Sequence, residues 1–151
     1  MPSTPDPRIL DLYKLAVEMA DRVTARRAGA NAFFVTIQSS VIAALGFLSA
    51  SAPVPRDRYL VALCVAGTAA SAIWFLLLRS YRDLNSAKFK VIDQLEDELP
   101  IAIFREEWTY LKVDPVRRWR KSYAELGTIE RWAPGLFALI NLTLAISILA
   151  S

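Results

Sequence analysis

Residues 59–78 read YLVALCVAGTAASAIWFLLL, a run of twenty residues without Asp, Glu, Lys or Arg. A helix rises about 1.5 Å per residue and the hydrocarbon core of a bilayer is about 30 Å thick, so this run is long enough to cross a membrane. Two more uncharged blocks flank it, residues 28–55 and residues 133–151. Three such blocks leave too few polar faces for a water-soluble bundle. We therefore predict an all-α integral membrane protein with three transmembrane helices.

The distribution of Lys and Arg predicts how the chain is oriented. Five of these residues lie in residues 1–28 and eleven in residues 79–132, whereas the turn between the first two spans holds only Arg56 and Arg58. Cytoplasmic loops carry an excess of Lys and Arg. We therefore expect the N-terminus and the long loop in the cytoplasm and the C-terminus outside. Trp74 and Trp132 would then lie at the cytoplasmic edges of their spans, where aromatic side chains anchor helices at headgroup level.

Breakers and cap signals subdivide the chain further. Asp6 and Pro7 are typical of a helix start, and Pro100 is expected to end the cytoplasmic continuation of the second span. The predicted parts are a cytoplasmic amphipathic helix at 1–28, a transmembrane hairpin at 29–78, a cytoplasmic helical loop at 79–132 and a third transmembrane helix at 133–151. The helices of the hairpin are expected at about 30–52 and 59–78. The helices of the loop are expected at about 79–99, 101–111 and 115–126.

No pattern in the sequence indicates a catalytic, cofactor-binding or metal site. The chain has no histidine, which excludes Ser-His-Asp and Cys-His catalysis, and its single cysteine, Cys64, lies in the second span. Five scattered glycines form no phosphate-binding loop. We expect a protein that is not an enzyme and needs no cofactor.

Two charged clusters in the loop have simple interpretations. The acidic residues around Pro100 are suited to a divalent cation or to a lipid-modifying site, but salt bridges or a solvated face are favoured, and no nucleophile–base pair accompanies them. The basic run 117–121, RRWRK, most simply contacts anionic lipid headgroups, and no nucleic-acid partner is expected. The acidic cluster comprises Glu96, Asp97, Glu98, Glu106 and Glu107.

The spans contain polar and small residues that allow two interpretations. Gln38 in the first span and Asn141 in the third are suited either to lining a polar pore or to an interhelical hydrogen bond, in which they could satisfy each other. The second span carries small residues at a spacing of four that permits close helix approach. These are Ala62, Ala66 and Ala70, with Gly67 and Ser71 beside them.

Two segments resemble the RipA-type family of small octameric bacterial inner-membrane proteins. The first includes LYKL at 12–15, EMADRV at 18–23 and ARR at 25–27. The second combines Trp74, SYR at 80–82, LN at 84–85, AKF at 87–89, VI at 91–92, Glu96, LP at 99–100, Phe104 and EW at 107–108.

The resemblance implies a multi-pass protein of the bacterial inner membrane that forms a homo-oligomer of eight subunits among membrane lipids. It offers no catalytic residue. The matching polar and aromatic positions fit oligomer assembly or packing instead. We expect the arginines to join the N-terminal helix to the cytoplasmic extension of the second span, with Glu18, Asp21 and Asp83 as their charge partners. These positions are Arg22, Arg26, Arg27, Tyr81, Arg82, Asn85, Lys88 and Trp108.

The predicted function is that of a non-enzymatic, oligomer-forming membrane scaffold that docks a protein partner through its cytoplasmic helices. Amphipathic helices with apolar stripes left to bury support this interpretation. The alternative is a gated pore or a membrane-perturbing effector channel, in which polar span residues such as Gln38 would face the axis of a ring.

Overall fold

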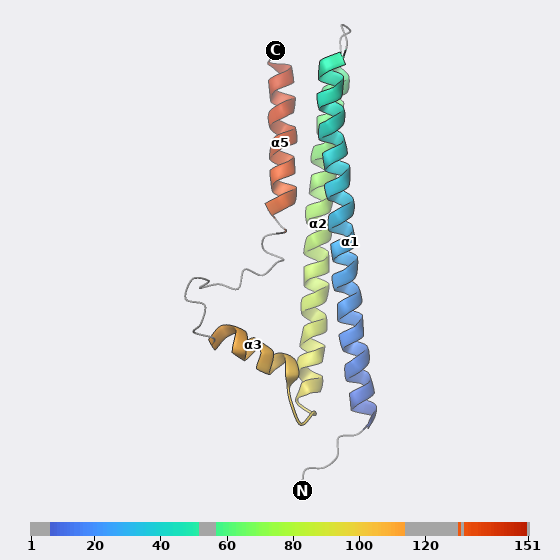
Figure 1. Cartoon of the computed structure of the whole chain (residues 1–151), viewed down its shortest axis with the longest axis vertical. Coiled ribbons are helices and arrows are strands. Elements are labelled where there is room, and N and C mark those ends of the chain that lie inside the picture. The colour runs from blue at the N-terminus through green and yellow to red at the C-terminus, as the bar shows by residue number, and fades with distance from the viewer. Residues whose placement is uncertain (1–6, 52–56, 114–129, 131, 151) are drawn as a thin grey trace. The chain divides into compact units, whose positions relative to one another are not determined.

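A computed structural model describes residues 7–51, 57–113, 130 and 132–150, and every element in these residues is a helix. The expected cap at Asp6, the turn between the first two spans, and the basic helix with its run 117–121 lie outside the described residues. The helices are α1 (Pro7–Ser51), α2 (Asp57–Glu96), α3 (Ile103–Val113) and α5 (Trp132–Leu149) (Figure 1).

Three of these helices are long and apolar enough to cross a membrane. Their apolar stretches lie in Pro7–Ala50, Asp57–Glu96 and Trp132–Leu149. The predicted all-α membrane architecture with three transmembrane helices is thereby confirmed, while the orientation across the bilayer stays a prediction. α1 passes Gly29 without a break, because a single glycine costs a helix only about 1 kcal/mol relative to alanine.

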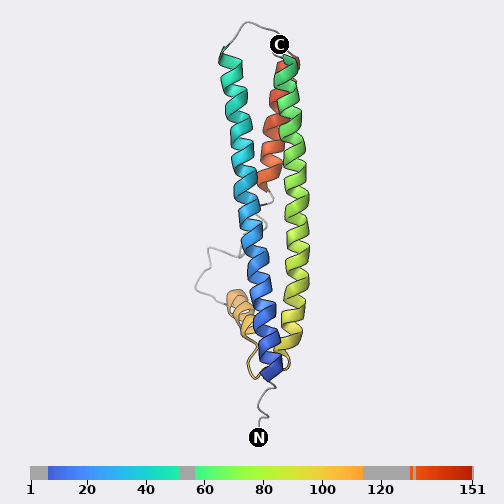
Figure 2. The same ribbon diagram turned by 90° about the vertical axis from the view of Figure 1, so that its right-hand side faces the viewer.

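The chain divides into two compact units, and α1 and α2 contribute residues to both. Unit 1 comprises residues 1–26 and 81–125, which include α3. Its core is built on Tyr13, Ala20 and Ile92. The rings of Phe89 and Phe104 meet edge to face with their centroids 5.7 Å apart, and so attach α3 to α2. Within this unit α3 lies on one side of the α1–α2 pair (Figure 2).

Unit 2 comprises residues 27–80 and 126–151 and contains the apolar parts of α1 and α2 together with α5. Its interior contains two apolar clusters and a set of buried polar side chains. One cluster is built on Phe34, Trp74 and Leu78, and the other on Leu45, Leu60 and Cys64. The buried polar side chains are Gln38 of α1, Ser71 of α2 and Asn141 of α5. The buried positions of α2, Leu60, Cys64, Gly67, Ser71, Trp74 and Leu78, recur every three or four residues, which is the spacing of a helix–helix seam.

The predicted series of small residues on α2 differs from the seam that the structure has. Ala62 and Ala66 are exposed in the protomer, whereas Gly67 and Ser71 are buried. The reason is the seam spacing of alternating three and four residues, which selects Gly67 and Ser71 and turns Ala62 and Ala66 outward, while Ala70 is partly buried.

Candidate functional site

A closed set of hydrogen bonds joins the three helices of unit 2. Nε2 of Gln38 donates to the carbonyl oxygen of Gly67 over 2.8 Å and to Oγ of Ser71 over 2.7 Å. Nδ2 of Asn141 donates to Oε1 of Gln38 over 3.1 Å, which connects α5 to α1. Gln38 and Asn141 are fully buried, with 0% of each side chain exposed. The structure therefore brings together the two polar residues that the sequence analysis considered as a pair.

Gly67 is part of this arrangement because it makes room for Asn141. A Cβ atom at position 67 would lie 2.6 Å from Oδ1 of Asn141, closer than Cβ contacts occur in proteins. Nδ2 of Asn141 also donates to the carbonyl oxygen of Phe137, while its Oδ1 accepts no hydrogen bond from any residue that the structure describes. Gly67 was expected only to permit close helix approach, and its contact with Asn141 was not predicted.

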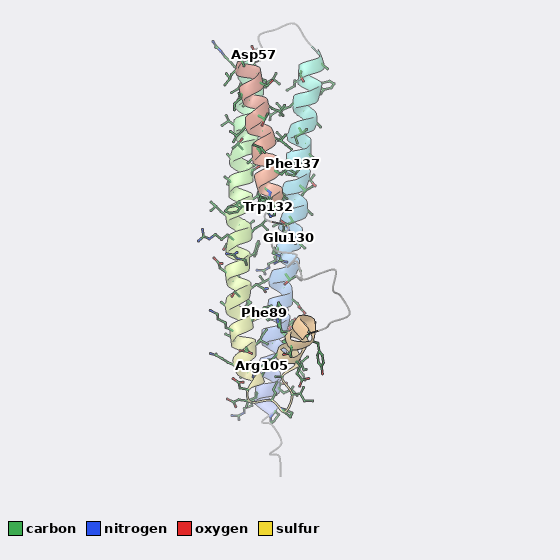
Figure 3. The ribbon with its side chains drawn as sticks, turned by 90° about the vertical axis from the view of Figure 1, so that its left-hand side faces the viewer. Asp57, Phe89, Arg105, Glu130, Trp132 and Phe137 are labelled. Carbon is green, nitrogen blue, oxygen red and sulfur yellow. The ribbon has the colours of Figure 1, made fainter. Side chains whose placement is uncertain are left out.

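An aromatic stack lies next to the polar set. Trp74 stacks on Phe34 with ring centroids 5.8 Å apart and planes 4° from parallel, and Phe137 of α5 approaches it at 6.0 Å. Nε1 of Trp74 donates to Oδ1 of Asn31 over 2.9 Å. Trp74 is 1% exposed, so the prediction that it anchors the helix at headgroup level is wrong. The physical reason is its seam position on α2. Trp132, in contrast, is 77% exposed and lies at the first turn of α5 (Figure 3).

A buried carboxylate organises unit 1. Glu96, the last residue of α2, accepts hydrogen bonds from the hydroxyl of Tyr13 at 3.1 Å and from the backbone N–H groups of Phe104 and Arg105 at 2.8 and 3.2 Å. These N–H groups belong to the first turn of α3, where a helix has unpaired donors and favours negative charge. One side chain, 2% exposed, thus connects three helices. Glu96 was expected to lie on a solvated face or in a salt bridge with the rest of the acidic cluster, so its role in joining three helices was not predicted.

The neighbouring acidic residues pair with a single arginine. Arg105 lies 2.8 Å from Asp93 and 2.8 Å from Asp97, and these contacts raise the pKa of its guanidinium (Figure 3). Salt bridging was the favoured interpretation of this cluster, and Asp97 takes part in it. Among the residues that the structure describes, no three His, Cys, Asp or Glu side chains come together as metal ligands.

The environment of Tyr13 predicts a distinct alkaline transition. Burial, followed by the hydrogen bond to Glu96 and the charge of that carboxylate, raises the pKa of Tyr13 to about 12. An unfolded tyrosine ionises near pH 10. Because the folded pKa is the higher one, the contribution of Tyr13 to stability is complete below about pH 10 and is lost as the pH rises to about 12.

Ultraviolet titration of phenolate formation tests this expectation. The difference between wild type and Tyr13→Phe should show one tyrosine that ionises close to pH 12, well above the ordinary tyrosine value of about pH 10. Ionisation of Tyr13 near the ordinary value of about pH 10 would contradict the buried hydrogen bond.

The predicted assembly residues occupy varied positions. Arg22 pairs with Glu18 at 2.7 Å and Arg82 with Asp83 at 3.5 Å, both along the same helix. The expectation that these two arginines join α1 to α2 is therefore wrong. Glu18 lies one turn from Arg22 on the same face of α1, where it is the easier partner to reach. Of the remaining residues, Arg27 pairs with Glu130 at 3.3 Å in unit 2, Arg26 and Trp108 are exposed, and Tyr81, Asn85 and Lys88 are partly buried.

Comparison with known proteins identifies the family. No curated protein and no solved structure matches the chain. The model of the octameric membrane protein family (8xMP) matches residues 10–150. The chain therefore belongs to the octameric membrane protein family, and the prediction of a homo-oligomeric protein of this family is confirmed.

Proposed function

We propose that the protein is a non-enzymatic scaffold of the bacterial inner membrane, in which eight copies form a ring that docks a cytoplasmic partner. Membership in an octameric membrane family supports the assembly. The excess of Lys and Arg in residues 1–28 and 79–132 supports a cytoplasmic position for unit 1. Unit 1 would then form the cytoplasmic part of the ring.

The burial of the polar span residues is the observation that carries this proposal. A pore needs polar groups that face its axis. Gln38 and Asn141 instead bind each other and α2 inside one protomer, and both are fully buried. Side chains with this environment hold helices together in a membrane, where an interhelical hydrogen bond contributes about 0.6–1.7 kcal/mol. The spans thus act as a structural anchor for unit 1.

The absence of histidine and the use of the buried carboxylate support a role without catalysis. The carboxylate of Glu96 accepts hydrogen bonds from Tyr13 and from the first turn of α3. Asp93 and Asp97 form salt bridges with Arg105. The hydroxyl group that contacts Glu96 belongs to Tyr13, which is buried and therefore poorly placed to meet a substrate. The proposed activity is therefore binding.

A gated pore is the second candidate, and the exposed hydroxyl residues of α1 favour it. Thr36, Ser39 and Ser40 are all exposed in the protomer. Thr36 and Ser40 donate to backbone carbonyls one turn earlier, so their hydrogen atoms are already used inside the helix. If α1 lined the axis of the ring, Ser39 is the residue of this group whose hydroxyl would face the pore.

Flux through proteoliposomes separates the two functions. We expect vesicles that contain the octamer to stay closed to K⁺ and to small dyes, and Gln38→Leu to lower the stability of the protomer by about 1 kcal/mol with no effect on flux. Flux that disappears with Gln38→Leu would replace the scaffold with a pore lined by this side chain. Flux that disappears only with Ser39→Leu would assign the axis to the exposed side of α1.

A further inference from the structure

One face of unit 1 carries apolar side chains that no described helix covers. On α1, Leu12, Leu15 and Met19 are 54%, 52% and 44% exposed, and their spacing of three and four residues places them in one stripe. On α2, Leu84 and Val91 are exposed and lie two turns apart. We refer to these five residues as the open face.

The open face lies on the side of the α1–α2 pair away from α3. Phe89 and Glu96 contact α3. At about 100° per residue, Val91 points about 160° away from Phe89 around α2. Because α1 and α2 run antiparallel, the same rotation brings Leu12, Leu15 and Met19 to this side of the pair. Within unit 1, Figure 2 shows this side toward the viewer, with α3 behind the pair.

The opposite side of unit 1 is the outer surface of α3, which is both apolar and acidic. Ile103 and Tyr110 are exposed, and they lie seven residues apart on one side of the helix. Glu106 and Glu107 are exposed between them. Phe104 lies about 100° around α3 from Ile103 and contacts Phe89. We refer to Ile103, Glu106, Glu107 and Tyr110 as the α3 face.

The symmetry of the octamer requires two different faces of this kind. Copies that enter the membrane with one orientation share an axis along the membrane normal, so they form a closed ring with head-to-tail contacts. Each subunit of such a ring turns by about 45° from the next, and its two contact surfaces lie on nearly opposite sides. The open face and the α3 face are placed in this way within unit 1.

We propose that the α3 face of one protomer docks on the open face of the next, around the whole ring. Charge supports this occupant. Arg26 continues the stripe of Leu12, Leu15 and Met19 along α1 and is exposed. Arg22, which pairs with Glu18 on its own helix, borders the same stripe. The α3 face supplies Glu106 and Glu107. Apolar side chains then meet apolar ones, and basic side chains meet acidic ones, as complementary interfaces require.

Cross-linking between copies tests the proposal. In a Cys64→Ala background, Leu15→Cys and Ile103→Cys are combined in one chain, and a short bismaleimide is added to the detergent-solubilised octamer. We expect a ladder on a denaturing gel that ends at eight copies, because every neighbour presents the second cysteine. Neither single variant should cross-link. Leu10→Cys with Ile103→Cys is the matched control, since Leu10 is exposed on the other side of α1, and it should give no ladder.

Three results would overturn the proposal. Dimers from Leu15→Cys alone would mean that two open faces meet each other. A full ladder from the Leu10 control would place the α3 face of the neighbouring copy against the other side of α1. An octamer that native mass spectrometry finds intact, but that gives no ladder, would place the contact elsewhere or leave the open face to another protein.

Complementation provides a second measurement that does not depend on cross-linking. Leu15→Glu and Ile103→Glu each remove one face, so each variant alone should be monomeric. An equal mixture retains one intact pair of faces and should give dimers by native mass spectrometry, with helical content by circular dichroism as the folding control. A mixture that stays monomeric would contradict the pairing. Both measurements address assembly alone, so they stand whether or not the ring conducts or docks a partner.

Discussion

Glu96→Ala should release α3 from unit 1 and produce the larger of the two strongest effects we expect. The substitution removes a buried carboxylate that accepts hydrogen bonds from Tyr13, Phe104 and Arg105. Hydrogen bonds to charged groups contribute about 1.5–3 kcal/mol each, and donors left buried without partners cost further. We expect the local stability of the α3 attachment to fall by about 3–5 kcal/mol, which is close to complete loss.

Hydrogen–deuterium exchange is the measurement for this change. Amides of residues 103–113 should exchange much faster in Glu96→Ala than in wild type, while amides of α5 should be unaffected. Glu98→Ala is the matched control, because it removes an equal charge two residues away from an exposed position and should change stability by less than about 0.5 kcal/mol. Equal protection of α3 in both variants would show that Glu96 does not hold the helix.

Trp74→Ala should destabilise unit 2 by about 3 kcal/mol or more. Removal of a buried tryptophan from a well-packed interior typically costs about 3–5 kcal/mol. In a membrane the loss comes mainly from packing, because lipid chains are as apolar as the side chains that they replace. Trp74 contacts Phe34 and Phe137, and it also donates to Asn31, which would be left without this partner.

Reversible unfolding in mixed micelles, followed by circular dichroism, measures this effect. Trp132→Ala is the control, since it removes the same side chain from an exposed position and should shift the midpoint little. Trp74→Phe should fall between the two, because it keeps a stacked ring and loses the hydrogen bond. A similar loss for Trp74→Ala and Trp132→Ala would argue that Trp74 faces lipid or headgroups after all.

The two units are thus stabilised by different interactions. In unit 1, which we propose to be cytoplasmic, apolar burial around Tyr13 and Ile92 is available as a driving force, and the carboxylate of Glu96 attaches the short helix. In unit 2, close packing and interhelical hydrogen bonds must hold the helices, because the surrounding lipid offers no hydrophobic effect between them. The polar set around Gln38 and the stack around Trp74 are therefore the expected points of sensitivity.

Some of the polar contacts could be anticipated and others could not. Gln38 and Asn141 were considered as partners because an amide in an apolar span needs a hydrogen bond and few polar residues were available to provide it. Glu96 gave no such signal. It lies among other acidic residues, and its partner Tyr13 is 83 residues away along the chain. The arginines of α1 were expected to reach α2, yet the ion pairs of Arg22 and Arg82 are local.

The sequence by itself determined the fold class and the three transmembrane helices, because the length and charge of a span are local properties that a bilayer imposes on any helix. It also led to the octameric family through residues spread over much of the chain. Only the tertiary structure decided which side of each helix is inside. That choice buried Trp74 and Gly67, turned Ala62 outward and left the open face of unit 1 uncovered. It depends on the register between helices, which is set by contacts such as Gln38 with Asn141 across 103 residues, and local periodicity does not contain them.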